Sequence, residues 1–204
     1  MTQYGFAVEL DRCSGCKACA MACKDRNDLD LGTKYRKVID YAGGTWDVSN
    51  DGVCTPSGVF SYSVSVSCNH CDNPACVANC PTGAMRKDSE TGIVTSDPEV
   101  CIGCGTCVES CPYRAPRLVG EELHSGKCDM CYGLVSAGGN PRCVDACPMR
   151  ALHFGTIEDL RAEFGDNADA GPLPESTMTS PNIVLVANRN AGDGMIVSSP
   201  EEIA

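Results

Sequence analysis

The stretch CIGCGTCVESCP at residues 101–112 spaces four cysteines as C-x2-C-x2-C-x3-C and follows the last of them with proline. With two residues between successive cysteines, the chain curls around one corner of a cubane, and three thiolates converge on it. The three-residue step turns the fourth thiolate toward a second cluster, and the proline ends any short helix there. This stretch predicts cysteine ligation of [4Fe–4S] clusters.

Sixteen of the 17 cysteines fall into four groups of this kind. The groups are Cys13, Cys16, Cys19 and Cys23; Cys68, Cys71, Cys76 and Cys80; Cys101, Cys104, Cys107 and Cys111; and Cys128, Cys131, Cys143 and Cys147. Lys24, not proline, follows the first group, so we expect a helix there to continue to about Asn27. The remaining Cys54 fits no group, and we interpret it as an unreactive core or loop residue.

Two other uses of cysteine compete with this interpretation. Disulfide frameworks belong mainly to short secreted domains, and residues 1–10 carry no basic segment followed by an apolar run, so we expect no signal peptide. Zinc is the stronger competitor, because paired C-x2-C elements bind zinc in many small domains. Zinc sites use two pairs at a time, whereas these cysteines include triplets with a fourth member before proline. A zinc-stabilised interaction module stays an alternative.

Composition predicts a thin hydrophobic core. Aromatic residues make up only 5% of the chain, which contains 21 glycines and 12 prolines. We therefore expect bound clusters to supply much of the folding free energy. The formal net charge of −11 argues against nucleic acid as a partner. No apolar run reaches the roughly twenty residues of a transmembrane helix, so another subunit would have to supply any membrane anchor.

Short hairpins, short helices and loops are expected between the cysteine groups. Alternating apolar and small polar residues predict a strand over 59–66. Residues 93–95 and 152–154 are short apolar pieces suited to two-stranded ribbons that cover clusters. Helical apolar spacing predicts one short helix over 157–164, stopped by Gly165, and NIVLVA from Asn182 predicts a strand.

Residues outside the cysteine groups indicate no substrate site. His70 lies inside the Cys68–Cys71 turn, where we expect it to hydrogen-bond near a cluster, since four cysteines already supply the ligands. His124 and His153 have no partner pattern and are interpreted as structural. A phosphate-binding loop, a nucleophile elbow and a zinc-protease motif are all absent from the sequence. We expect a non-catalytic chain.

The four groups form an outer pair, the first and fourth, and an inner pair, the second and third. A two-cluster ferredoxin needs two motifs that face each other. Nested pairing would join the members of the outer pair and of the inner pair, whereas sequential pairing would join neighbours in the chain. Spacing alone does not decide between them.

Motifs along nearly the whole chain carry a family resemblance. They are QYGFAVELDRCSGCKACAMACKD at 3–25, YAGGTW at 41–46, SCNHCDNPAC at 67–76, VCIGC at 100–104, KCDMCY at 127–132, CPMRALHFG at 147–155, GPLP at 171–174 and SPNIV at 180–184. These motifs closely resemble the iron–sulfur, electron-transfer subunit of the dimethyl sulfoxide reductase family of molybdopterin oxidoreductases.

The resemblance implies four [4Fe–4S] clusters with nested pairing. The implied ligand sets are Cys13, Cys16, Cys19 and Cys147 for cluster 1; Cys23, Cys128, Cys131 and Cys143 for cluster 2; Cys68, Cys71, Cys76 and Cys111 for cluster 3; and Cys80, Cys101, Cys104 and Cys107 for cluster 4. Related nitrate reductase subunits have tryptophan and a three-iron cluster at the position of Cys104, so its cysteine implies four irons.

The implied fold is α+β, with two nested modules like bacterial ferredoxins. Residues 1–36 and 112–155 would form the outer module and 59–111 the inner one, with an insertion at 37–58 and a partner-binding tail at 156–204. The outer module would face a molybdopterin catalytic subunit and the inner one an integral-membrane subunit that oxidises quinol. The chain would then relay electrons in anaerobic respiration.

The resemblance also implies a location. Family members are exported folded with their catalytic subunit, so we expect this chain on the outer, periplasmic face of the membrane, attached through its partners. A relay subunit of a soluble molybdenum, tungsten or hydrogenase-type complex without quinol is the alternative.

Overall fold

The computed structural model describes residues 2–189 and 191–199, so residue 190 and residues 200–204 of the predicted tail lie outside the described residues. Short helices and strands alternate along the chain, as expected for an α+β protein. The helices are α1 (Ala18–Arg26), α2 (Ala75–Ala78), α3 (Thr106–Ser110), α4 (Tyr132–Val135), α5 (Arg142–Asp145), α6 (Ile157–Phe164) and a 3-10 turn (Ser176–Met178). The strands are β1 (Tyr4–Glu9), β2 (Lys37–Val48), β3 (Cys54–Val66), β4 (Met85–Lys87), β5 (Val94–Ser96), β6 (Arg117–Val119), β7 (His124–Gly126), β8 (Leu152–Thr156), β9 (Ile183–Val186) and β10 (Met195–Ile196).

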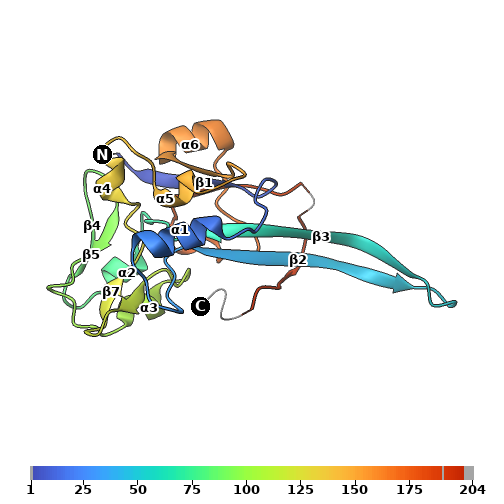
Figure 1. Cartoon of the computed structure of the whole chain (residues 1–204), viewed down its shortest axis with the longest axis horizontal. Coiled ribbons are helices and arrows are strands. Elements are labelled where there is room, and N and C mark those ends of the chain that lie inside the picture. The colour runs from blue at the N-terminus through green and yellow to red at the C-terminus, as the bar shows by residue number, and fades with distance from the viewer. Residues whose placement is uncertain (1, 190, 200–204) are drawn as a thin grey trace.

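β1 is the centre of a three-stranded sheet in the order β8-β1-β9. It runs antiparallel to β8 and parallel to β9. Phe6, Ala7 and Val8 are all buried, because α6 packs on one face of this sheet and the part of the chain that carries the cysteine groups packs on the other (Figure 1). The expectation of a two-stranded ribbon at 152–154 is therefore wrong. This segment is part of β8, and its partner β1 comes from the other end of the sequence.

The helix predicted over 157–164 is confirmed as α6, and Gly165 caps its C-terminus. At its start, the Thr156 hydroxyl accepts a hydrogen bond from the Asp159 N–H (3.2 Å) and donates one to Asp159 Oδ2 (2.6 Å). Such a cap satisfies a backbone donor that the first turn leaves unpaired.

Replacing Thr156 with alanine is expected to destabilise α6 by about 1 kcal/mol, because it removes this cap. Hydrogen exchange of the α6 amides measures the effect as faster exchange confined to that helix. Thr177→Ala, in the exposed 3-10 turn, is the matched control. Unchanged exchange in Thr156→Ala would contradict a stabilising role for the cap.

A long hairpin of β2 and β3 extends away from the rest of the molecule (Figure 1). The strand predicted over 59–66 is confirmed but begins earlier, at Cys54, and the expectation of only short hairpins is wrong here. The turn at 49–52 reads Ser-Asn-Asp-Gly, and Ser49 Oγ accepts the Val53 N–H at 3.1 Å. This turn sequence between β-forming residues is the signal that could have identified the hairpin.

The remaining elements form the cysteine-rich body. α1 packs against α5 and α2 against α3, with the ribbons β4–β5 and β6–β7 beside them. The predicted helix after the first cysteine group is confirmed, since α1 ends at Arg26 with Asn27 as its cap. β5 and β9 confirm the short strands predicted near 93–95 and after Asn182, and each lies within one residue of its expected start. All four cysteine groups therefore lie in one compact half of the molecule (Figure 1).

Candidate metal centres

The sixteen grouped cysteines line four small cavities, four to each. The sets are Cys13, Cys16, Cys19 and Cys147; Cys23, Cys128, Cys131 and Cys143; Cys68, Cys71, Cys76 and Cys111; and Cys80, Cys101, Cys104 and Cys107. We call these cavities 1 to 4 in that order. Because a set of four cysteine thiols lines each cavity, the four cavities suit occupants of one kind.

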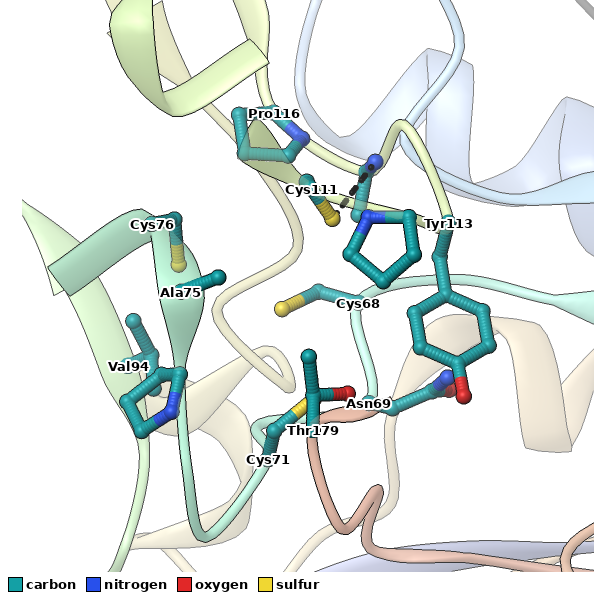
Figure 2. Close-up of a pocket in the computed structure, with 13 residues that line it drawn as sticks. Cys68, Asn69, Cys71, Ala75, Cys76, Val94, Cys111, Tyr113, Pro116 and Thr179 are labelled. Carbon is teal, nitrogen blue, oxygen red and sulfur yellow. Dashed lines mark hydrogen bonds between the residues drawn. The ribbon is translucent and has the colours of Figure 1, made fainter. Parts of the chain in front are cut away.

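Each cavity takes three cysteines from one group and the fourth from another. The first and fourth groups exchange Cys23 and Cys147, and the second and third exchange Cys80 and Cys111. Figure 2 shows cavity 3, where the thiols of Cys68, Cys71 and Cys76 share one space with that of Cys111 from the neighbouring group. These sets coincide with the ligand sets that the family resemblance implies.

A left-handed turn shapes the start of every group. The residue just before the second cysteine has positive φ in all four: 68° at Gly15, 45° at His70, 66° at Gly103 and 58° at Met130. This conformation turns the backbone so that the two flanking thiols face the same space. It favours glycine, because a side chain in the left-handed region costs roughly 1–2 kcal/mol.

A second turn follows the last cysteine of three groups, where the sequence repeats Cys-Pro-x-x-Ala. The residue before alanine has positive φ, at 71° for Gly83, 46° for Arg114 and 51° for Arg150. A backbone N–H then reaches back to the cysteine sulfur in each loop. Ala115 donates to Cys111 (3.5 Å; Figure 2), Ala151 to Cys147 (3.3 Å) and Met85 to Cys80 (3.4 Å). Sequence reasoning identified the prolines but missed the repeated alanine.

Hydroxyl groups from distant strands also contact the sulfurs. Ser65 of β3 lies 3.3 Å from Cys19 in cavity 1, and Ser125 of β7 lies 3.2 Å from Cys107 in cavity 4. Hydrogen bonds of this kind stabilise thiolate and tune the group that it binds. Nothing in the local sequence marks either serine, because each reaches its cavity only through strand pairing.

Burial of the cysteines disfavours the thiolate form in these cavities. It raises the pKa of Cys76 to about 12 and that of Cys71 to about 11, with repulsion from neighbouring thiolates adding to both. Burial also raises the pKa of Cys128, with repulsion from Cys23 adding to it. Four thiolates can share such a cavity only beside a cationic group that accepts sulfur ligands. The donor sets therefore fit iron–sulfur clusters.

Arg36 is a buried cation that lines cavity 2 and contacts Ser65 of cavity 1, and sequence reasoning missed it. It is only 1% exposed, and its guanidinium donates to Ser65 Oγ (3.1 Å) and Ser67 Oγ (3.0 Å). The guanidinium carbon also lies over the Phe6 ring, 4.5 Å from the ring centroid. Burial opposes its charge, but attraction to the cysteines of both cavities, Cys143 and Cys19 foremost, leaves its pKa raised. Arg36 is thus placed to stabilise negative charge in both cavities.

His70 is fully buried, and its Nδ1 accepts the Val94 N–H at 2.8 Å beside cavity 3. Burial, together with Lys127 and Lys87, lowers its pKa, so the ring is neutral. The expected hydrogen bond near a cluster site is confirmed. His124 and His153 each contact a glutamate, Glu122 and Glu9, in keeping with structural roles.

Cys54 lies outside all four cavities. It is exposed at the start of β3, opposite Val48 near the end of the hairpin. The interpretation of Cys54 as a core or loop residue is therefore wrong, because the residue belongs to a strand and is exposed.

Gly103→Ala is expected to lower the iron content at cavity 4. The added Cβ would lie 2.9 Å from the Leu123 carbonyl oxygen, at a φ of 66° that side chains disfavour. Iron analysis and the rate of cluster loss in denaturant measure the effect. Gly133→Ala, whose Cβ meets nothing within 4 Å, is the control. Equal iron retention in both variants would show that this turn does not shape the site.

Across the described residues, no helix is both long enough and apolar enough to span a membrane.

Comparisons with known proteins identify iron–sulfur domains in this chain. Residues 59–157 match the family model of a 4Fe-4S dicluster domain, and residues 10–30 match that of a 4Fe-4S binding domain.

The B subunit of the anaerobic dimethyl sulfoxide reductase of Escherichia coli (strain K12) is 47% identical, with 99% of each protein covered. The corresponding B subunit of Haemophilus influenzae (strain ATCC 51907 / DSM 11121 / KW20 / Rd) is 47% identical over 94% of this chain and 92% of its own length. The iron–sulfur subunit of the nitrate-inducible formate dehydrogenase of E. coli (strain K12) is 35% identical over 75% of this chain and 54% of its own length. Because two of these relatives match over nearly their whole length, the chain belongs to the family of iron–sulfur subunits of dimethyl sulfoxide reductases.

Proposed function

We propose that the chain carries four [4Fe–4S] clusters and relays electrons between a membrane subunit that oxidises quinol and a molybdopterin catalytic subunit. The observation that carries this proposal is the set of four cavities, each lined by four cysteines from two groups. Bound clusters would supply one-electron oxidation and reduction. The chain itself would contribute no substrate chemistry.

Short helices would hold neighbouring clusters together. α1 supplies Cys19 to cavity 1 and Cys23 to cavity 2, one helical turn apart. In the same way, Cys76 from α2 lines cavity 3, and Cys80, just after α2, lines cavity 4. Cys128 of cavity 2 and Cys68 of cavity 3 lie in one cluster of packed, buried side chains, which links the two pairs of cavities. These contacts support the nested modules and a single path through cavities 1, 2, 3 and 4.

The protein groups around the path would set its properties. Backbone N–H groups and the hydroxyls of Ser65 and Ser125 would donate to ligand sulfurs, and Arg36 would favour the more negative, reduced state of clusters 1 and 2. Burial of most ligands would exclude water. The chain's residues would thus tune potentials by charge, hydrogen bonding and burial.

The same proposal assigns a partner subunit to each end of the path and a location to the complex. Cluster 1 would face the catalytic subunit and cluster 4 the membrane anchor, with the whole assembly on the outer face of the membrane. Two of the relatives are named as the B component of a reductase, which supports a role beside other subunits.

Iron and acid-labile sulfide analysis of anaerobically purified protein, with electron paramagnetic resonance during a reductive titration, tests the proposal. We expect about sixteen irons per chain and several interacting signals from reduced clusters. Stoichiometric zinc with little iron would overturn it in favour of an interaction module. Identification of the co-purifying subunits separates a quinol-linked complex from a soluble one.

A further inference from the structure

A large groove outside the cysteine cavities gathers three positively charged side chains. Lys37, Arg114 and Arg117 line this open space, whose empty volume is about 1960 Å³ and which we call the basic groove. Its walls come from the base of the β2–β3 hairpin, from α3 and the residues that follow it as far as Arg117, and from residues 172–174, 196 and 198 of the tail. The fold thus brings together charges that are remote in sequence.

These three cations have no acidic partner among the described residues, although the chain as a whole carries a net charge of −11. Lys37 is only 6% exposed, and its ammonium donates to the Arg114 carbonyl oxygen at a long 3.4 Å. Arg117 donates to the carbonyl of the preceding proline, and Glu109, which also lines the groove, pairs with none of the three. Elsewhere basic residues do find carboxylates, as Arg12 does with Glu9.

The charges repel one another within the groove. Burial, followed by the neighbouring Arg117 and Arg114, lowers the pKa of Lys37 to about 8. Burial and Arg114 likewise lower the pKa of Arg117. Negative charge entering the groove would relieve this repulsion, so the groove is complementary to an anion.

Apolar side chains also line the groove. Ile39, Val66, Val108, Leu173 and Ile196 line it together with three prolines. A bare inorganic anion would satisfy the charges and leave these walls uncovered. An extended peptide that alternates carboxylates with apolar side chains would satisfy both features.

We propose that the basic groove is the docking site for an acidic segment of a partner subunit, one that presents two or more Asp or Glu carboxylates among apolar side chains. This inference rests on the proposed function, because it requires that the chain belong to a multi-subunit complex. The groove adjoins cavity 3, since Pro112 and Tyr113 line both, and Figure 2 shows Tyr113 at the edge of cavity 3. Docking there would bring the partner's negative charge close to Cys111.

Zero-length carbodiimide cross-linking of the native complex tests the proposal, because this reagent joins a lysine amine to a carboxylate in direct contact. We expect Lys37 to be joined to an Asp or Glu of another subunit. In parallel, Arg114→Gln/Arg117→Gln is expected to reduce retention of that subunit at least about tenfold. The control variant Arg12→Gln/Arg161→Gln removes two positive charges outside the groove, and it should retain the partner subunit as the wild type does.

Each other outcome overturns the inference. A Lys37 cross-link only within the same chain would show that the chain fills its own groove. Loss of binding to phosphatidylglycerol vesicles in Arg114→Gln/Arg117→Gln, with subunit retention unchanged, would assign the groove to lipid. Iron-loaded wild-type protein that retains no other subunit would exclude docking altogether. Failure of the relay proposal is distinguishable, because it would appear as missing iron in the wild-type chain itself.

Discussion

Cys128→Ser is expected to lose about four of the roughly sixteen irons and to stop electron transfer through the chain. Cys128 is buried, lines cavity 2 and belongs to the same cluster of packed, buried side chains as Cys68 of cavity 3. Its loss would therefore remove a ligand at the middle of the proposed path, and every electron must cross that point. Iron analysis and the reduction of clusters 3 and 4 by an electron donor that enters at cluster 1 measure the two effects.

Cys54→Ser is the matched control for this experiment. Cys54 is the one cysteine of the sequence outside the four groups, and it lies exposed on the hairpin. We expect wild-type iron content and full reduction in this variant. Full iron content in Cys128→Ser would contradict the assignment of cavity 2 as a cluster site.

Arg36→Met is expected to lower the midpoint potentials of clusters 1 and 2 by roughly 60 mV, equivalent to about a tenfold change in a one-electron equilibrium. The sign follows from charge: reduction adds an electron, and the buried guanidinium favours the more negative state. Methionine keeps a flexible apolar stem beside Phe6 but removes the charge and the hydrogen bonds to Ser65 and Ser67. Redox titration followed by electron paramagnetic resonance measures the shift.

Arg161→Met, on the exposed side of α6, removes the same charge far from the cavities and should leave all potentials unchanged. Equal shifts in both variants would indicate a general charge effect. An unchanged potential in Arg36→Met would show that the cavities do not sense this cation.

Local features were the predictable part of the fold. The helix over 157–164 followed from its apolar spacing and its terminal glycine, and the strand after Asn182 from a short β-forming run. Each of these signals lies within the segment that forms the element. The turn at 49–52 could have identified the β2–β3 hairpin, but the length of the hairpin depends on pairing of 37–48 with 54–66, which no local signal gives.

The features of the candidate site likewise divide into local ones, which the sequence predicted, and ones that depend on distant segments, which it did not predict. Cysteine spacing predicted the convergence of three thiols in the ferredoxin-spaced groups, since it depends on a few adjacent dihedral angles such as the left-handed turn at Gly103. Ser65, Ser125 and Arg36 escaped prediction because each reaches a cavity from a distant segment. The same is true of Lys37, which meets Arg114 and Arg117 only after folding.

The sequence by itself therefore determined the chemistry of this protein: sixteen cysteines in four groups, spaced for iron–sulfur ligation, with no motif for a substrate. Spacing alone permits both nested and sequential pairing of the groups, whereas the tertiary structure packs α1 on α5 and α2 on α3, which places the first group beside the fourth and the second beside the third. Tertiary structure also decided which charges surround the cavities. Electrostatic interactions act through space, so they depend on where the chain returns and not on the order of its residues.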